Sequence, residues 1–269
     1  MAYSGPTDPT PETLAELVAA HTRRIPFENL DPLMGVPVTD LSPAGLTAKL
    51  VRRRRGGYCY EQNNLMRYVL TALGFEVDPL IGRVVWMDPA GLGGPPHAET
   101  HQTLVVRIPG GSGQYSGRYL VDVGFGGQTL SSPIPLCSGH IRQTRHEPFR
   151  LLRHGRGYVL ETLLHDTWQP LYTFRDEPRP LIDSEVGSWY VSTHPRSIFV
   201  VGLTAAIVTD DARWNLRGRN LTVHTRAGDT DRIRFDTAAQ VLEALTDRFG
   251  IDLSGLGDVE ARVAQVLDS

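Results

Sequence analysis

The stretch Arg55–Asn63 reads RGGYCYEQN, and it places one of the chain's two cysteines between two tyrosines, just after an arginine and a glycine pair. Beyond Cys59, apolar residues recur on one helical face: Leu65, Met66, Val69, Leu70 and Leu73. Gly74 is a typical stop for such a helix. The pattern predicts a helix that begins at or just before Cys59, and we interpret Cys59 as a catalytic nucleophile.

The chemistry of a thiol explains why this position matters. A thiol attacks as the thiolate, and a free cysteine with a pKa of about 8.5 needs a base or a positive environment to ionise at neutral pH. The start of a helix supplies unpaired N–H groups and the positive end of the helix dipole. Gly56 and Gly57 would permit a tight, strained turn that presents the thiol and lets these N–H groups stabilise an oxyanion. The alternative is that Cys59 is a small, buried and unreactive cysteine on a core helix. Without further residues to support catalysis, this alternative is favoured, because buried inert cysteines are common.

A histidine and a carboxylate on strand-like segments favour catalysis. His101 begins the run HQTLVVRI, and Asp122 lies inside the apolar run YLVDVGF, where an unpaired charge would be costly to bury. An Asp122–His101 pair would orient the imidazole and favour a Cys59 thiolate beside an imidazolium. His97, in a flexible Pro/Gly-rich loop, is a rival base with less fixed geometry. As alternatives, His101 is a half-exposed strand residue and Asp122 a turn carboxylate that backbone N–H groups satisfy.

The chain changes character twice, which predicts an α+β fold. Residues 1–80 are predicted to be helical, with Thr10-Pro11 and Ser42-Pro43 as helix starts. Residues 81–185 contain short strand-like runs between Pro/Gly-rich connections, which favours an antiparallel barrel or sandwich. Residues 186–269 mix strands and helices. A chain of 269 residues can bury a sizeable core, and we expect one compact unit of two or three subdomains.

Composition excludes several classes of protein. A net charge of −3 and a sequence pI near 6.3 give no reason to expect nucleic acid or an anionic membrane as a partner. Since the N-terminal segment lacks a basic region followed by an apolar run, we expect a cytoplasmic protein with two free thiols. We expect no metal, because only His97 and His101 are spaced as a ligand pair, and that pair spans a loop.

Four motifs, taken together and in order, resemble the bacterial branch of the arylamine N-acetyltransferases. They are IPFENL (Ile25 to Leu30), RGGYCYEQN around Cys59, THQTLVV around His101 and VDVGFGG around Asp122. The resemblance runs from about Ala15 to the C-terminus. It implies a helical bundle, an antiparallel β-barrel and an α/β lid with a cysteine-protease-like Cys-His-Asp arrangement. It also implies a ping-pong reaction, in which acetyl-CoA acylates Cys59 and an arylamine, arylhydrazine or arylhydroxylamine takes the acetyl group.

The same resemblance implies further site residues. Those expected to line the acceptor cleft are Phe27, Tyr58, Thr100, Phe125 and Phe199. Flat aromatic walls suit an aryl ring, although core packing is the commoner fate of phenylalanine. Those expected to let CoA approach the backbone are Gly124, Gly126 and Gly127.

Two charged residues near these motifs are expected to form an ion pair. We hypothesise that Arg55 pairs with Glu28, because each lies beside a stretch that resembles the family.

Two other enzyme classes are alternatives with the same Cys-His-Asp order. They are an amide (macrolactam) synthase of the same family and a cysteine hydrolase or transglutaminase-like enzyme. The partners expected are small molecules, acetyl-CoA and an aryl amine or hydrazine, with a possible homodimer.

Overall fold

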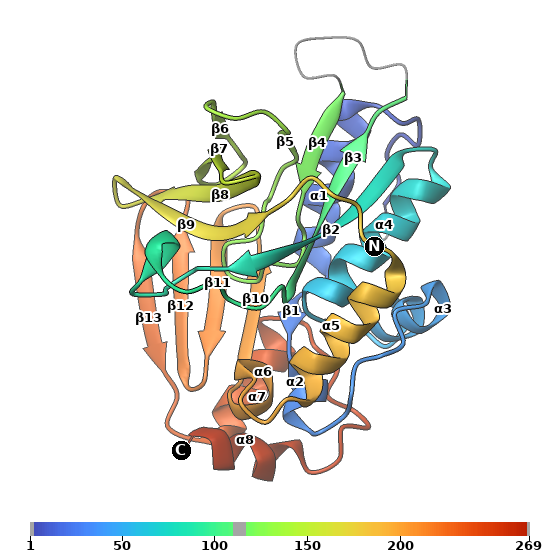
Figure 1. Ribbon diagram of the computed structural model, residues 1–269. Coiled ribbons are helices and arrows are strands. Elements are labelled where there is room, and N and C mark those ends of the chain that lie inside the picture. Colours follow the sequence, from blue (N-terminus) through green and yellow to red (C-terminus); the bar gives the residue numbers. More distant parts are fainter. Residues whose placement is uncertain (1–2, 110–116, 268–269) are drawn as a thin grey trace.

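The computed structural model describes residues 3–109 and 117–267 (Figure 1). Its N-terminal part is helical, and its helices are α1 (Pro11–Arg24), α2 (Leu30–Leu33), α3 (Pro43–Leu46), the π-helical turn η1 (Thr47–Arg52) and α4 (Cys59–Ala72). The predicted starts are confirmed, because the Thr10 side chain accepts a hydrogen bond from the Thr13 N–H and the Ser42 side chain accepts one from the Gly45 N–H. Gly74, just after α4, has a φ of 88°, which explains why the helix ends there.

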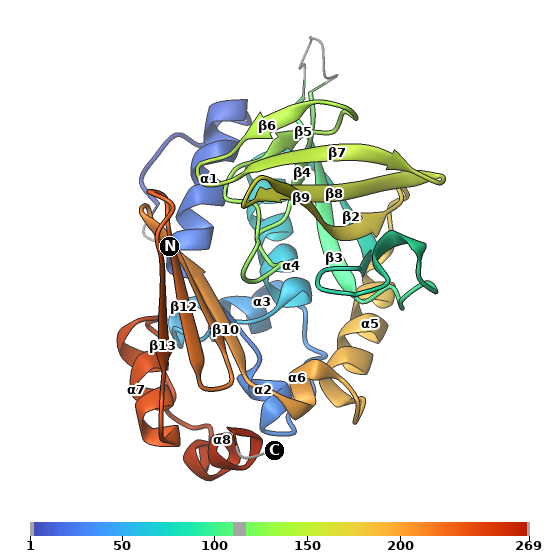
Figure 2. The same cartoon turned by 90° about the vertical axis from the view of Figure 1, so that its left-hand side faces the viewer.

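The middle of the chain forms an eight-stranded antiparallel sheet that curves into a nearly closed barrel (Figure 2). Its strands are β2 (Glu76–Val84), β3 (His101–Arg107), β4 (Arg118–Val121), β5 (Ile134–Pro135), β6 (Ile141–Gln143), β7 (Pro148–His154), β8 (Gly157–Leu164) and β9 (Thr167–Phe174). They are ordered β5-β4-β3-β2-β9-β8-β7-β6, and a short 3-10 helix, η2 (Gly91–Gly93), lies between β2 and β3. Buried side chains such as Leu80, Phe149 and Leu171 form the barrel's core.

The C-terminal part carries a second sheet with helices packed on it. Its elements are α5 (Leu181–Thr193), α6 (Ile198–Val201), β10 (Thr204–Val208), β11 (Ala212–Arg217), β12 (Asn220–Thr225), β13 (Thr230–Arg234), α7 (Ala238–Asp247) and α8 (Val259–Leu267). The sheet takes its first strand, β1 (Phe27–Glu28), from the N-terminal part and is ordered β1-β10-β11-β12-β13. Residues of the N-terminal part thus contribute to the C-terminal sheet. The predicted division into domains at residues 80 and 185 stays a prediction.

Strand register explains how two distant residues come together. In the β3–β4 ladder Leu104 lies opposite Val121, so the same register continued places Thr103 opposite position 122. His101 is two residues from Thr103 and therefore on the same face, diagonal to Asp122. Helix α4 packs against β2 and β3, which brings its N-terminus to the same place. Within the described part of the chain, no helix is both long and apolar enough to cross a membrane.

Candidate active site

Cys59 is the first residue of α4, as the sequence predicts. Its residue surface is only 4% exposed, and its sulfur lies 3.7 Å from the carbonyl oxygen of Thr100, the residue before β3. The Glu61 carboxylate accepts a hydrogen bond from the Tyr58 N–H at 3.2 Å and so fixes the first turn of the helix. The thiol therefore lies at the positive end of a fourteen-residue helix, directly beside the strand that carries His101.

The two glycines before Tyr58 are needed for space and not for strain. A Cβ on Gly56 would lie 2.1 Å from the Pro26 carbonyl oxygen, and one on Gly57 would lie 2.5 Å from a Glu61 carboxylate oxygen. Neither glycine has a positive φ, so the predicted strained turn at this pair is wrong. The positive φ in this segment belongs to Arg54, at 49°.

His101 and Asp122 form a buried pair. The His101 Nε2 atom lies 2.7 Å from Asp122 Oδ2, and the two side chains are 3% and 1% exposed. Asp122 does not lie in mid-strand as predicted, because β4 ends at Val121. The expectation of a turn carboxylate is met as well, since the Gly124 N–H donates to Asp122 Oδ1 at 3.0 Å. One aspartate thus orients the histidine and shapes the loop that follows.

The surroundings of His101 favour its charged form. Burial lowers the pKa of His101, but the negative charge of Asp122 and hydrogen bonds to Asp122 and Cys59 outweigh it and raise that pKa to about 10. The pKa of Asp122 lies below its ordinary value, because burial, which raises it, is outweighed by His101 and by hydrogen bonds from Asn63 and Gly124. With Nε2 bonded to Asp122, Nδ1 is the ring nitrogen available to the thiol. The site can therefore hold an imidazolium beside the Cys59 sulfur at neutral pH.

Asn63 is a residue of this site whose role the sequence analysis missed. It lies one turn after Cys59 on α4 and donates from Nδ2 to Asp122 Oδ1 at 3.0 Å and to the Gln102 carbonyl oxygen at 2.7 Å. Its Oδ1 accepts a hydrogen bond from the Val123 N–H at 3.0 Å. One amide thus ties the nucleophile's helix to both strands that carry the pair. The i, i+4 spacing from Cys59 was the signal that could have found it.

The raised pKa of His101 predicts how stability depends on pH. The folded protein holds a proton on His101 between about pH 6.5 and pH 10, where an unfolded histidine has lost it. This stabilisation is complete below about pH 6.5 and is lost as the pH rises through about 10. We expect the free energy of unfolding of the wild type, measured by urea denaturation, to fall over that window relative to His101→Gln. An equal slope in both proteins would contradict the assignment.

Comparison with known proteins shows the family to which this chain belongs. The sequence profile of a family described as N-acetyltransferase matches residues 10–257. The arylamine N-acetyltransferase of Mycolicibacterium smegmatis is 65% identical over 261 residues, covering 96% of this chain and 92% of the relative. That of Mycobacterium tuberculosis is 54% identical, covering 98% and 92%. The chain belongs to the arylamine N-acetyltransferase family. It is accordingly an acyltransferase.

Solved structures of family members match the whole fold. The M. smegmatis arylamine N-acetyltransferase superimposes with a TM-score of 0.94 at 62% identity, covering all of this chain and 96% of that one. The Mycobacterium marinum arylamine N-acetyltransferase in complex with CoA superimposes with a TM-score of 0.93 at 54% identity, covering 97% and 95%. The predicted combination of helical bundle, barrel and α/β lid is thereby confirmed.

The predicted aromatic residues make two separate sets of ring contacts. Phe199 contacts both Phe27 and Tyr58, with ring centroids 5.8 and 5.4 Å apart. Phe125 meets the His101 ring edge to face at 5.1 Å. Phe27, Phe125, Phe199 and Thr100 are partly exposed, as a cleft wall requires, whereas Tyr58 is fully buried and its hydroxyl pairs with Ser188 Oγ at 2.8 Å. Their contact with an acceptor stays a prediction.

Tyr172 is a further ring at the site, on β9, that the sequence analysis did not single out. It is fully buried, and its centroid lies 4.6 Å from that of His101 and 5.3 Å from that of Phe125. Its hydroxyl lies 3.3 Å from Thr103 Oγ1. Tyr172 therefore packs against the imidazole ring of His101.

The three glycines after Asp122 have local packing roles. A Cβ on Gly124 would lie 2.7 Å from the Cys59 Cα, and one on Gly127 would lie 2.8 Å from the Asn215 side chain. Gly126 has a φ of 83° and packs against the Phe27 ring. The loop therefore approaches the nucleophile's helix closely, and an approach of CoA to its backbone stays a prediction.

Gly124 offers a sensitive test of this geometry. We expect Gly124→Ala to lower kcat about 10- to 100-fold, because a methyl group would push the loop away from Cys59 and displace Asp122. Gly93→Ala is the matched control, since nothing lies within 4 Å of its Cβ position. Steady-state acetyl transfer by both variants measures the difference. Equal rates would contradict the close approach.

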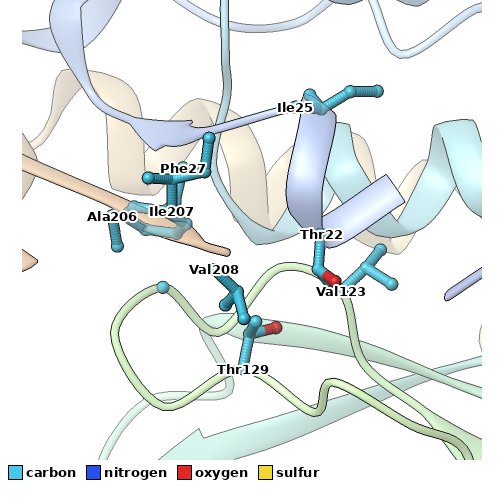
Figure 3. Close-up of a pocket in the computed structure, with 9 residues that line it drawn as sticks. Thr22, Ile25, Phe27, Val123, Thr129, Ala206, Ile207 and Val208 are labelled. Atoms are coloured by element: carbon cyan, nitrogen blue, oxygen red, sulfur yellow. The ribbon is translucent and has the colours of Figure 1, made fainter. Parts of the chain in front are cut away.

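A small hollow lies behind the same loop (Figure 3). It is lined by Thr22, Ile25, Phe27, Val123, Gly126, Thr129, Ala206, Ile207 and Val208. The lining is mostly apolar and includes no member of the Cys59–His101–Asp122 group. The hollow therefore lies between α1, this loop and β10, and Cys59, His101 and Asp122 do not line it. In residues 3–109 and 117–267, no three His, Cys, Asp or Glu side chains are grouped so that they could hold a metal.

The predicted Arg55–Glu28 pair is confirmed as part of a larger buried network. Arg55 lies 2.8 Å from both Glu28 and Asp31, and Lys49, the only lysine, lies 2.6 Å from both Asp31 and Glu61. Burial raises the pKa of Glu61 to about 7, although the positive charge of Lys49 lowers it in part. The network ties β1 and α2 to the first turn of α4. It thus holds the element that carries Cys59.

Proposed function

We propose that this enzyme transfers an acetyl group from acetyl-CoA to arylamines, arylhydrazines and arylhydroxylamines through an acetyl-Cys59 intermediate. The observation that carries the proposal is the buried His101–Asp122 pair, held at 2.7 Å directly beside the thiol at the start of α4. Membership of the family supports the aryl acceptor, and the CoA bound to the M. marinum relative supports the donor.

The first half-reaction forms the acetyl-enzyme. The Cys59 thiolate attacks the carbonyl carbon of acetyl-CoA, and a new C–S bond forms. N–H groups in the first turn of α4 stabilise the tetrahedral oxyanion. The C–S bond to CoA then breaks, and the His101 imidazolium gives its proton to the departing CoA sulfur. The products are acetyl-Cys59, neutral His101 and CoA.

The second half-reaction restores the enzyme. The acceptor nitrogen attacks the thioester carbonyl, and neutral His101 accepts the proton that the nitrogen loses. The Cys59 thiolate leaves, so the thiolate–imidazolium couple is regenerated. His101 has then regained from the acceptor nitrogen the proton that it gave to CoA. Asp122 keeps Nε2 protonated throughout, which leaves Nδ1 to exchange the proton.

A transferase must also keep water from the thioester. The half-buried rings of Phe27, Phe125 and Phe199 would surround an aryl acceptor and exclude water around Cys59. Steady-state kinetics with acetyl-CoA and a panel of arylamines and hydrazines tests this. We expect parallel double-reciprocal lines and little CoA release without acceptor. CoA release at the same rate with and without acceptor would indicate a hydrolase and overturn the proposal.

A further inference from the structure

Gln62, three residues after Cys59 on α4, holds together the turn that leads into the nucleophile's helix. Its side-chain Nε2 donates to the Pro26 carbonyl oxygen at 2.7 Å and to the Gly57 carbonyl oxygen at 3.2 Å. The two segments also meet directly, because the Gly57 N–H donates to the Pro26 carbonyl oxygen at 3.3 Å. One amide group thus holds the residue before Phe27 against the turn before Cys59.

The backbone oxygens around this group fix which way the Gln62 amide faces. The Ile25 carbonyl oxygen is a third one, 3.5 Å from Gln62 Nε2, and a carbonyl oxygen accepts hydrogen bonds but cannot donate them. If the amide turned over, its own oxygen would face these three oxygens in the protein interior, where Gln62 is fully buried. Gln62 Oε1 must therefore point the other way, and it needs a donor there.

His21 on α1 supplies that donor. Its Nε2 atom lies 2.5 Å from Gln62 Oε1, and both residues are fully buried. Since Gln62 Oε1 can only accept, the imidazole carries its proton on Nε2. Among the described residues Nδ1 has no hydrogen-bond partner, so the contact with Gln62 is the one that sets the tautomer. Burial lowers the pKa of His21 to about 4, although the hydrogen bond with Gln62 opposes this, and the ring is neutral at neutral pH.

The position of His21 is set by packing that lies away from the thiol. Leu17 and Val18 of α1 belong to one buried apolar cluster with Met66 and Leu70 of α4. This cluster fixes the spacing of the two helices, and His21 extends from the last part of α1 to the first part of α4. The imidazole therefore relates the turn before the nucleophile to the position of α1.

We propose that His21 is a positioning residue for acetyl transfer, which acts through Gln62 to hold the Cys59 thiol in place for attack. It keeps the Gln62 amide facing the Pro26 and Gly57 carbonyl oxygens, and these contacts fix the entry of the chain into α4. The thiol and the N–H groups that would stabilise the oxyanion both lie in that first turn. This inference rests on the proposed function, but it concerns the placement of the thiol and not the identity of the acceptor.

Two amide variants of His21 separate positioning from simple packing. A glutamine can place an N–H donor where His21 has Nε2, whereas an asparagine can place one only where it has Nδ1. We expect His21→Asn to slow the acetylation of Cys59 by acetyl-CoA about 10- to 100-fold, and His21→Gln to stay within about threefold of the wild type. Stopped-flow release of CoA in the first turnover measures this rate, and urea denaturation measures the stability of each variant. Equal rates in the two variants, whether fast or slow, overturn the proposal.

The partner residue provides a second variant, should His21→Asn fail to fold. Methionine is about as long as glutamine but has no amide, so Gln62→Met should slow acetylation about as much as His21→Asn. The double variant should be no slower than Gln62→Met alone, because the two residues act as one unit. Effects that multiply in the double variant would overturn the link. Thr22→Val is the matched control on α1, because the buried Thr22 hydroxyl donates within its own helix, to the Val18 carbonyl oxygen, and this variant should keep the wild-type rate.

Alkylation by iodoacetamide distinguishes a failure of this inference from a failure of the proposed function. The reaction needs no acetyl-CoA, and peptide mapping separates Cys59 from Cys137. At neutral pH we expect Cys59 to be alkylated about tenfold more slowly in His21→Asn, because the displaced thiol loses its imidazolium, and at nearly the wild-type rate in His21→Gln. A wild type that acetyl-CoA does not acetylate would end the proposed function, whereas equal alkylation of Cys59 in all three proteins would end the role of His21.

Discussion

Replacement of Asp122 by asparagine is expected to lower kcat/KM for acetyl transfer about 10⁴-fold while the fold is retained. The Asp122 carboxylate accepts hydrogen bonds from His101 Nε2, Asn63 Nδ2 and the Gly124 N–H. An asparagine has one acceptor oxygen, so its NH₂ group must face a donor on one side or the other. His101 would lose either its orientation or the tautomer that leaves Nδ1 free to act as a base.

An exposed pair of the same chemistry provides the control. His97 Nε2 lies 2.7 Å from Asp88 Oδ2, with the His97 side chain 46% exposed. Asp88→Asn should leave kcat/KM within about twofold, because this pair lies in a solvated loop. Steady-state kinetics and a thermal melt of both variants measure activity and folding separately. Near wild-type activity in Asp122→Asn would remove this aspartate from the mechanism.

Replacement of Arg55 by methionine is expected to have the largest effect on stability, about 3–5 kcal/mol. Arg55 is 2% exposed and bonds to Glu28, whose side chain is fully buried, and to Asp31. Its removal leaves the Glu28 carboxylate without its countercharge in the interior. The turn before Cys59 would also lose its tie to β1, so activity should fall as well.

Arg107→Met is the matched variant for this prediction. Arg107 lies 2.6 Å from Glu76, but the two side chains are 44% and 58% exposed. Such a pair contributes at most about 1 kcal/mol. Urea denaturation of both variants gives the comparison. A loss in Arg55→Met no larger than that in Arg107→Met would show that the buried network does not hold the fold together.

Local sequence signals predicted the elements that depend on local interactions. The start of α4 at Cys59 and its end before Gly74 follow from apolar spacing and one glycine. His101 at the start of β3 follows from an apolar run of β-branched residues. The end of β4 at Val121 was misplaced, because YLVDVGF continues the apolar pattern while Asp122 is taken out of the strand by His101, Asn63 and Gly124.

The features that were missed depend on contacts between distant segments. The two-residue strand β1 forms because Phe27 and Glu28 pair with Ala206 and Ala205 of β10, far along the chain. Tyr172 reaches His101 because β9 and β3 both pair with β2, and no local pattern encodes that pairing. Helix α5 was not predicted, because its polar residues lie inward, against the rule that pattern-based assignment uses.

Intact-mass measurement after incubation with acetyl-CoA alone tests the central claim most directly. The wild type is expected to gain the mass of one acetyl group on Cys59, to release one equivalent of CoA and to lose that mass when an arylamine is added. Cys59→Ser is expected to gain none under the same conditions. An unmodified wild type, or acetylation that persists in Cys59→Ser, would contradict the account.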